Sequence, residues 1–363
     1  MPNLLLCMTP GIGLNTWESI GSLKRELSTY VEYVRRGWKV MILTFDKGEI
    51  SDLPEGIKAV RFPNRYLLFL LPWTHRKLGE WADVIKTNQS VHAYLYTKAA
   101  RYWKKPILLR CGYVHGEYLE SINGRTSRVM LYQYMEAGAF QRATCCQVPT
   151  EELSTWVHRR YRVPEKKITV VPNFVNIDLF SPMPVEKRKR SIISVGRLVP
   201  VKRYELLINA CAEIPGCRLT IVGEGPERQN LEDLAREKKL DLNLTGNLPN
   251  EELPLILQAN QVFAITSSWE GHPKALVEAM ACGMPCLCVD GIGIKNIIEN
   301  GKNGWSVKAL HDSLFAGISE LFEKQVLCDN LSRGAREYVL NHYGFNTCFS
   351  REYDSISSIV CAK

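Results

Sequence analysis

The chain has 363 residues, of which 45% are apolar and 23% charged, a composition typical of a globular protein long enough for two domains. These values exclude extended disorder, and no apolar run, Leu67–Leu71 included, approaches the roughly 20 residues that span a bilayer. The net charge of +8 lies in one half: residues 1–175 have 25 Lys and Arg against 15 Asp and Glu, and the remainder has 21 against 23, which predicts a basic surface for nucleic acid, anionic lipid or a phosphorylated substrate.

The sequence carries no targeting or metal signal. The N-terminal residues lack the basic start, apolar core and cleavage site of a secretion signal, so we expect a cytoplasmic protein. Twelve cysteines lie mostly inside apolar runs and are expected to be reduced and buried. Cys282, Cys286 and Cys288 are close enough to suggest a metal site, but no C-x-x-C pair or His at ligand spacing accompanies them.

Short apolar runs alternate with helical patterns through the first 172 residues, as in parallel α/β domains. The first run ends in T-P-G-I-G, where Gly11 and Gly13 would let the backbone approach a ligand closely. The spacing is not the dinucleotide fingerprint, so a tight turn without a ligand is an equal alternative. The predicted strands are Leu4–Met8, Lys39–Phe45, Ala59–Phe62, Asp83–Thr87, Ile107–Cys111, Cys145–Pro149 and Ile168–Val171, and the predicted helices are Ile20–Arg36, Met130–Phe140 and Glu151–Tyr161.

The segment Arg65–Lys77 is apolar, with Tyr and Trp near its ends and cations on both sides. One interpretation is shallow insertion into an anionic membrane surface, which would suit a lipid-linked acceptor. The interpretation that we favour is a buried helix of the first domain.

The segment Pro172–Pro182 contains two prolines and turn-forming Asn and Asp, and it breaks both periodicities. We place a boundary there between domains of residues 1–172 and 173–344, with a C-terminal helix of about residues 345–363 joining the first. Two parallel α/β domains with loops at their strand ends predict a cleft between them. The predicted strands of the second domain are Ser191–Val195, Leu219–Val222, Leu242–Thr245, Val262–Ile265 and Pro285–Val289, and the later helices are Tyr204–Ala212, Arg228–Lys239, Lys295–Asn300, Asp312–Glu323, Asn330–Asn341 and Phe345–Val360.

The stretch Ser267–Gly283 reads S-S-W-E-G-H-P-K-A-L-V-E-A-M-A-C-G and holds two carboxylates. Glu270 falls in the turn after a strand, and Glu278 falls in the helix that Pro273 should open, since proline suits a first helical turn. Unpaired N–H groups and the helix dipole at such a start favour an anion. The carboxylates are then free to bind hydroxyl groups.

Several motifs of the second half, taken together, resemble glycosyltransferase family 4, which comprises retaining GT-B enzymes that use sugar nucleotides. The motifs are S-V-G-R-L with Lys202, I-V-G-E-G-P, L-T-G-N-L-P and E-G-H-P-K-A-L-V-E-A-M-A-C-G-M-P, and Glu270 and Glu278 fit the Glu-x7-Glu pattern of the family. P-N-F-V-N-I-D-L-F resembles its interdomain segment. The resemblance implies an α/β protein of the GT-B fold, with two Rossmann-like domains facing each other across a cleft, the first for the acceptor and the second for the sugar nucleotide.

The resemblance also implies roles for single residues. Arg197 and Lys202 would hold the donor diphosphate, Glu270 the sugar hydroxyls and Glu278 the ribose. A physical argument agrees, because fixed cations stabilise the charge that develops on a leaving diphosphate. We therefore predict Arg197, Lys202 and Glu270 as catalytic residues. The implied donor-binding set is larger and comprises Gly11, Gly13, Gly196, Gly246, Leu248, His272, Lys274, Ala275, Leu276 and Glu278.

One departure concerns the first domain. Family members often carry a His at the end of a first-domain strand, whereas this strand ends in L-L-R-C-G-Y. We predict sugar or acceptor contacts for Arg110 and His115 without choosing which replaces that His. His272 fills a position that is often aromatic and is predicted to reach the sugar or the acceptor. A merely structural role is an equal alternative for either histidine.

The predicted function is transfer of a hexosyl group, with retention, from a UDP- or GDP-sugar to a glycan or lipid-linked acceptor in surface polysaccharide, lipopolysaccharide or glycolipid biosynthesis. No metal cofactor is expected, because Arg and Lys neutralise the diphosphate and no D-x-D cluster lies nearby. Peripheral contact with an anionic membrane on its inner face is expected if the acceptor is lipid-linked. No nucleic-acid partner is expected, because the basic half lacks a known binding motif. The alternatives are a sugar phosphorylase or synthase of the same fold and a non-catalytic nucleotide-sugar-binding protein, and the carboxylates beside a phosphate site disfavour a glycosidase.

Overall fold

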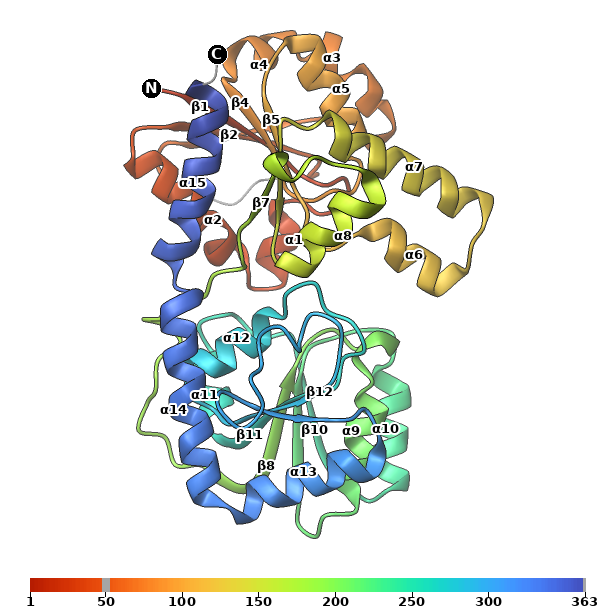
Figure 1. Cartoon of the computed structure of the whole chain (residues 1–363), viewed down its shortest axis with the longest axis vertical. Coiled ribbons are helices and arrows are strands. Elements are labelled where there is room, and N and C mark those ends of the chain that lie inside the picture. The colour runs from red at the N-terminus through yellow and green to blue at the C-terminus, as the bar shows by residue number, and fades with distance from the viewer. Residues whose placement is uncertain (48–52, 362–363) are drawn as a thin grey trace. The chain divides into compact units, whose positions relative to one another are not determined.

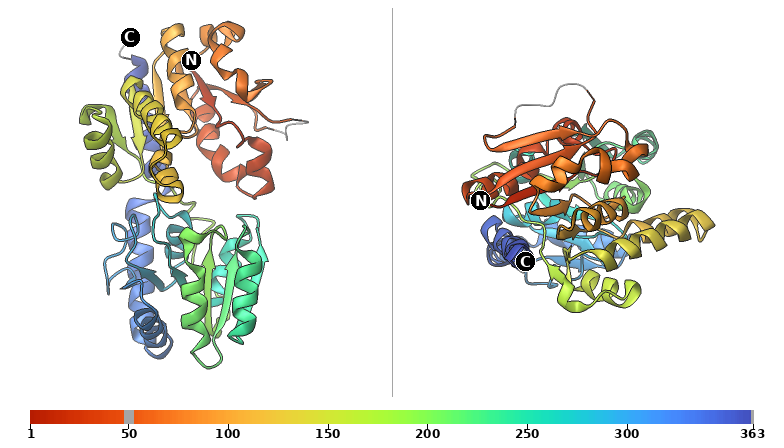
Figure 2. Two further views of the ribbon diagram at one scale, coloured as in Figure 1. Left: turned by 90° about the vertical axis from the view of Figure 1, so that its right-hand side faces the viewer. Right: turned by 90° about the horizontal axis from the view of Figure 1, so that it is seen from above.

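A computed structural model describes residues 1–47 and 53–361 (Figures 1 and 2). The chain forms two compact units, one of Met1–Pro172 with Phe349–Lys363 and one of Asn173–Cys348. Each unit is built on one parallel sheet that helices cover on both faces, which confirms the predicted α/β fold class. Among the described residues, no helix has the length and apolar content needed to cross a bilayer.

The first unit contains a seven-stranded sheet. Its strands are β1 (Asn3–Cys7), β2 (Lys39–Thr44), β3 (Ile57–Arg61), β4 (Val84–Thr87), β5 (Ile107–Arg110), β6 (Cys145–Val148) and β7 (Ile168–Val170). Their order across the sheet is β3-β2-β1-β4-β5-β6-β7, with parallel pairing throughout. β1 lies between β2 and β4 and is buried on both faces, which explains its unbroken apolar sequence.

The helices of this unit differ from the expectation in two ways. The helix expected over 20–36 begins only after Gly21, whose φ is +67°, and spans Leu23–Arg35. Three helices were not predicted, and none of them begins with a side chain that caps it: one follows Gly13, one follows His92 and one follows Val114. The helices are α1 (Leu14–Ser19), α2 (Leu23–Arg35), α5 (Ala93–Trp103), α6 (His115–Asn123), α7 (Ser127–Arg142), α8 (Glu151–Tyr161) and the 3₁₀ turn η2 (Glu165–Lys167).

The expectation of a buried helix at 65–77 is wrong. The chain forms a 3₁₀ helix, η1 (Arg65–Leu70), and then the short helices α3 (Leu71–Thr74) and α4 (Arg76–Trp81). A 3₁₀ helix repeats every three residues, so Leu68 and Leu71 point inward while Tyr66 and Phe69 point outward. Tyr66 is 72% exposed and Phe69 is 54% exposed.

The second unit contains a six-stranded sheet in the order β10-β9-β8-β11-β12-β13. Its strands are β8 (Arg188–Val195), β9 (Arg218–Val222), β10 (Asp241–Gly246), β11 (Asn260–Ile265), β12 (Cys286–Val289) and β13 (Trp305–Val307). Its helices are η3 (Pro200–Lys202), α9 (Tyr204–Ala212), α10 (Arg228–Glu237), α11 (Leu253–Gln258), α12 (Lys274–Ala281), α13 (His311–Glu323) and α14 (Gln325–His342). All five strands predicted for this half are present, and β13 is an addition.

The helix expected at Lys295–Asn300 is absent, and residues 293–297 form turns instead. The Asn303 side chain accepts a hydrogen bond from Glu299 N at 2.7 Å and donates one to Ile297 O at 2.9 Å. These bonds occupy backbone groups that a helix would pair internally, so a downstream side chain overrides the local pattern.

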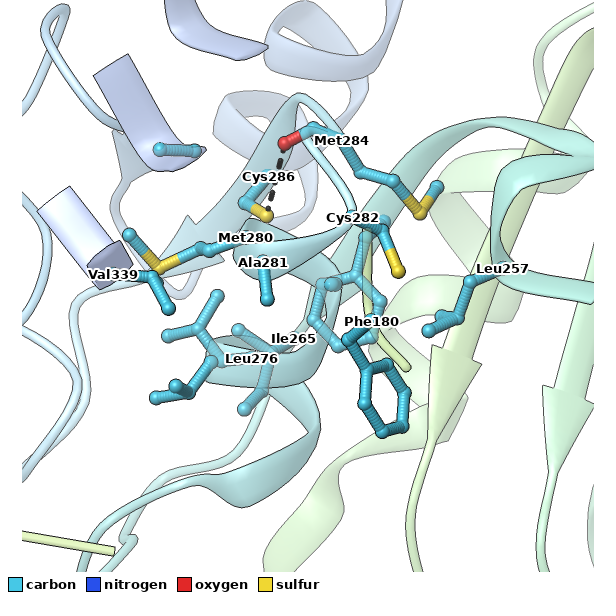
Figure 3. Close-up of a cluster of buried hydrophobic side chains, with 14 of the residues drawn as sticks. Phe180, Leu257, Ile265, Leu276, Met280, Ala281, Cys282, Met284, Cys286 and Val339 are labelled. Atoms are coloured by element: carbon cyan, nitrogen blue, oxygen red, sulfur yellow. Dashed lines mark hydrogen bonds between the residues drawn. The ribbon is translucent and has the colours of Figure 1, made fainter. Parts of the chain in front are cut away.

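The core of the second unit holds α12 in place. Figure 3 shows Leu276 and Met280 of α12 among Phe180, Leu257 and Ile265, all buried. A helix packed so closely has its start fixed relative to the neighbouring strand ends. Among the described residues all twelve cysteines are free and only Cys361 is exposed, as expected for reduced cysteines.

The last helix, α15 (Phe345–Cys361), contributes its later residues to the first unit. Glu352 on this helix is buried and accepts hydrogen bonds from Lys86 of β4 and from Gln147 of β6. Phe349 packs edge-on against Tyr33 of α2, with 5.1 Å between ring centroids. A buried ion pair therefore joins the C-terminal helix to the central strands of the first sheet.

Candidate functional site

The strongest candidate site lies at the carboxyl edge of the second sheet. β8 and β11 are parallel neighbours, so the loops that follow them emerge side by side. Lys202 comes from the first loop and Glu270 from the second, and Lys202 Nζ donates a hydrogen bond to Glu270 Oε1 at 2.6 Å. Both side chains are largely shielded, with 18% and 14% exposed, so the pair is ordered and still reachable by a ligand.

Backbone contacts fix the position of Lys202. Thr266 Oγ1, at the end of β11, donates to Lys202 O at 2.7 Å. Ser268 N donates to Val201 O at 3.0 Å. The Lys202 side chain also lies against Gly196, where a Cβ atom would stand 3.2 Å from Nζ. A glycine at 196 therefore leaves the room that the ammonium group occupies.

The Glu270 loop is held by a neighbouring turn. Glu270 N donates to Ile292 O at 2.9 Å, and Trp269 and Ile292 form a bridge. A Cβ atom on Gly293 would lie 2.0 Å from Glu270 O, and the φ of Gly293 is +83°. Only glycine permits both this conformation and this approach. The sequence pattern D-G-I-G-I indicated a turn but not its contact with Glu270.

The helix α12 begins beside Glu270, immediately after Pro273, as the sequence predicts. Pro273 is the cap residue, and no side chain caps the first-turn N–H groups. Those groups favour an anion. Lys274 and Ala275 are partly exposed, whereas Leu276 is fully buried and can offer a ligand only its backbone.

Glu278 lies one turn further along α12 and is 5% exposed. Asn250 Nδ2 donates to Glu278 Oε1 at 3.4 Å, a partner that the sequence did not indicate. Gly246 adopts φ +77° at the end of β10 and accepts a hydrogen bond from Gly223 N at 2.9 Å. Leu248 is half-buried against the core. Gly246 ends β10, and Leu248 and Asn250 follow it. They therefore lie at the same carboxyl edge of the sheet as the loop that carries Glu270.

Arg197 lies two residues after the end of β8 and is exposed. Within the described part of the chain, no salt bridge joins Arg197 to an acid. The preceding residue is clamped, because a Cβ atom on Gly223 would lie 2.1 Å from Gly196 O. The loop backbone is therefore fixed while the guanidinium remains available to a ligand.

His272 lies in the core, not in an open site. Its side chain is 7% exposed and packs edge-on against Tyr343, with ring centroids 4.9 Å apart. Within the described part of the chain, neither ring nitrogen has a hydrogen-bond partner. Burial, and then the charge of Lys274, lowers the pKa of His272 to about 4. The predicted reach toward a sugar or acceptor does not fit this placement, because the ring nitrogens are shielded.

In the first unit, the Gly11–Gly13 loop leads into α1. The Asp46 carboxylate accepts hydrogen bonds from Leu14 N at 2.7 Å and Asn15 N at 3.3 Å. A Cβ atom on Gly13 would overlap this carboxylate, whereas Gly11 is exposed with φ +91°. Asp46 thus engages the N–H groups of Leu14 and Asn15 at the start of α1, so the donor contact expected of Gly11 and Gly13 has to come from other groups.

Arg110 and His115 have different neighbours. Arg110 ends β5, and its charge acts on the buried Lys86 and Glu352. His115 begins α6, with Nδ1 3.2 Å from the Tyr113 hydroxyl and its ring 5.2 Å from that of Tyr132. Burial, and then His92, lowers the pKa of His115. Either side chain remains a candidate for contact with a ligand.

Two family models match the chain in consecutive segments. The model described as "Glycosyltransferase Family 4" matches residues 28–179, and that described as "Glycosyl transferases group 1" matches residues 178–338.

In the part of the chain that the structure describes, no three His, Cys, Asp or Glu side chains group in a way that suits a metal ion.

Named relatives and solved structures agree with the family models. The chain is 27% identical, over 73% of its length and 72% of the relative's, to the Escherichia coli UDP-Gal:α-D-GlcNAc-diphosphoundecaprenol α-1,3-galactosyltransferase. It is 31% identical to the putative colanic acid biosynthesis glycosyltransferase WcaL of the same species, over 55% of the chain and about half (53%) of that relative. Its fold is similar to sucrose-phosphate synthase from Thermosynechococcus elongatus (TM-score 0.84, 18% identity, 100% of both chains) and to Anabaena HepE in complex with UDP-glucose (0.82, 17%, 99% and 100%).

Proposed function

The chain belongs to glycosyltransferase family 4, and the family 4 and group 1 glycosyltransferase models together match residues 28–338; we propose that it transfers a hexosyl group, with retention, from a nucleoside-diphosphate sugar. The observation that carries this proposal is the contact of Lys202 with Glu270 at the start of α12. A cation, a carboxylate and the N–H groups of a helix start that no side chain caps meet there, and they match the diphosphate and hydroxyl groups of such a donor.

Each group takes a distinct part of the donor. Lys202 and Arg197 bind the diphosphate, the first as a compact charge and the second as a planar fork. Glu270 accepts hydrogen bonds from hydroxyls of the transferred sugar. Glu278, deeper along α12, accepts them from the ribose, and its contact with Asn250 orients it. Gly246 and Leu248 lie beside the base.

The reaction breaks the bond between the sugar C1 and the diphosphate oxygen. The acceptor oxygen bonds to C1 on the same face, and the acceptor proton passes to the departing diphosphate. Lys202, Arg197 and the N–H groups of α12 stabilise the negative charge that grows on the diphosphate. Because two cations are available at the leaving group, this mechanism does not require a metal.

We propose a lipid-linked sugar or a growing glycan as acceptor. Support comes from the named relatives, one of which is a transferase to a diphosphoundecaprenol-linked sugar and another a putative colanic acid biosynthesis enzyme. Bacterial-type surface polysaccharide or lipopolysaccharide synthesis is the setting that fits these relatives. With such an acceptor, the protein works in the cytoplasm, in peripheral contact with an anionic membrane.

A thermal-shift series against nucleotides tests the donor proposal. A nucleotide at 100 times its dissociation constant stabilises the protein by about 2.7 kcal/mol. We expect UDP or GDP to raise the melting temperature, and we expect the Glu278→Ala variant to lose about half of that shift at the same nucleotide concentration. If no nucleoside diphosphate or sugar nucleotide stabilises the wild type, the donor proposal is wrong.

A further inference from the structure

An aromatic face stands exposed on the first unit. We define it by Tyr66 and Phe69 of η1, Trp73 of α3 and Tyr102 of α5, whose exposed fractions are 72%, 54%, 59% and 53%. Four large aromatic residues this exposed on adjoining elements are unusual for a surface that faces only water.

The aromatic face is rigid because its underside is packed. Leu68 and Leu71 are buried in the core of the first unit. Trp103 Nε1 donates to Pro72 O at 2.9 Å and so fastens α3 to α5. The Trp73 and Tyr102 rings lie 5.7 Å apart, which makes the face continuous across the two helices. The face therefore does not depend on a loose loop, and its side chains have little ordering cost on binding.

Exposed cations lie on the elements that carry the aromatic face and on their neighbours. Arg65 stacks on the Tyr66 ring at 4.9 Å and also bonds its hydroxyl, so one cation sits directly at the edge. Arg76 pairs with Glu80, the only acid in residues 61–81. Further exposed cations lie at the end of β3, on α4, on α5 and just after α5, and they are Arg61, Lys77, Lys98, Arg101 and Lys104.

We propose that the aromatic face docks on the surface of an anionic phospholipid bilayer. Tyr and Trp favour the interface between water and hydrocarbon, where an apolar ring and a polar edge are both satisfied. The Arg and Lys side chains of these and adjoining elements match anionic headgroups. A second copy of the chain is a poorer occupant, because a two-fold interface would bring these cations against their own counterparts. The inference rests on the proposed lipid-linked acceptor for its purpose, but vesicle binding is measured without any transfer.

Sedimentation with lipid vesicles tests the docking. The wild type is mixed with vesicles of phosphatidylglycerol and phosphatidylcholine, and separately with pure phosphatidylcholine, at low and high salt. We expect binding to the anionic vesicles at low salt and weaker binding at high salt. We expect Phe69→Ser with Trp73→Ser to lower the affinity about tenfold or more. Arg76→Gln with Lys77→Gln should lower it roughly 20- to 30-fold, at about fivefold for each charge.

A matched control is Leu255→Ser in the second unit, where the residue is 60% exposed and lies outside the aromatic face. This variant should bind vesicles as the wild type does. The charge variants keep the exposed aromatic rings, so they report on docking even if the aromatic variants fold poorly. Wild-type protein that ignores anionic vesicles, or face variants that bind them unchanged, would overturn the docking. Self-association through these residues with unaltered vesicle binding would also overturn it.

Discussion

Lys202 and Glu270, 68 residues apart in sequence, meet through a 2.6 Å hydrogen bond at the edge of one sheet. Each neutralises the other while no donor is present. A bound sugar nucleotide would offer phosphate to the lysine and hydroxyls to the glutamate, so the pair holds both groups in position. Preorganised charges of this kind need no rearrangement when the diphosphate departs.

Removing the lysine should chiefly slow the chemical step. We expect Lys202→Ala to lower kcat by about 100-fold, comparable to the loss of one oxyanion donor. The matched control is Lys324→Ala, an exposed lysine paired with Glu320 on the second unit, which should leave kcat unchanged. Steady-state transfer assays with the donor in excess measure both. A Lys202 variant within twofold of wild type would contradict the role of this cation.

Gly293 offers a test of the loop support. Gly293→Ala places a methyl group where Glu270 O lies, whereas Gly301 has φ +77° and only Trp305 at 4.0 Å nearby. Both substitutions cost about 1 kcal/mol of backbone strain. Only Gly293→Ala should also lower turnover, by about 100-fold, because it displaces Glu270. Unfolding curves and transfer rates of the two variants are compared; equal activities would show that the turn does not position Glu270.

Nucleotide affinity should depend on Glu278. We expect Glu278→Ala to raise the dissociation constant of the nucleoside diphosphate about tenfold, the loss of roughly one charged hydrogen bond of 1.5 kcal/mol. Glu299→Ala, on an exposed turn of the same unit, serves as control. Calorimetric titration with UDP and GDP measures the change. If Glu278→Ala binds the nucleotides with unaltered affinity, Glu278 does not contact the ribose.

His272 predicts a pH dependence of stability. Its pKa is about 4 in the folded protein against 6.5 when unfolded, so the unfolded chain binds the proton first as pH falls. The free energy of unfolding should therefore drop between pH 6.5 and pH 4, by about 2 kcal/mol at pH 5. His272→Phe keeps an aromatic ring against Tyr343 and should remove this part of the drop. Denaturant unfolding of the wild type and of His272→Phe at pH 8 and pH 5 measures this drop. An equal pH dependence of the unfolding free energy in both proteins would contradict a buried, neutral His272 imidazole.

The buried pair of Lys86 and Glu352 predicts a stability pattern. Glu352→Ala leaves the Lys86 charge buried without its partner and should cost about 3–5 kcal/mol. The double change Lys86→Met with Glu352→Met removes both charges and should cost less than the single change. Chemical unfolding of the single and double variants gives both values. If the double variant is the less stable one, the pair is not the origin of the cost.

The sequence predicted much of the fold because buried parallel strands are continuous apolar runs. β1 and β11 are examples, and Pro273 marked the start of α12 correctly. Prediction failed where the deciding group lies elsewhere in the chain. Asn303 prevents the helix expected at 295–300, and no local pattern at those residues records that. The prediction of a buried helix at 65–77 failed because the chain there begins with a 3₁₀ helix. Its three-residue repeat, in place of the 3.6-residue repeat of an α-helix, divides the apolar residues between core and surface.

The candidate site shows the same division. Lys202 was selected by the motifs that resemble glycosyltransferase family 4, and Glu270 and Glu278 by the two carboxylates of the stretch that follows β11. The side chains that hold the site residues and loops in place could not be predicted from the sequence. Asn250 and Asp46 are distant in sequence from the groups that they bond, and only the folded chain brings them together. The burial of His272 depends on Tyr343, far along the chain.

In the proposed mechanism, Arg197 and Lys202 hold the diphosphate while the sugar leaves. The most direct measurement follows transfer from UDP- and GDP-sugars to a lipid-diphosphate-linked acceptor by NMR of the anomeric proton, with wild type and with Arg197→Ala combined with Lys202→Ala. We predict that the wild type keeps the anomeric configuration of one donor and that the double variant is slower by about 1,000-fold or more. An inverted product, or a double variant that transfers at nearly the wild-type rate, would contradict it.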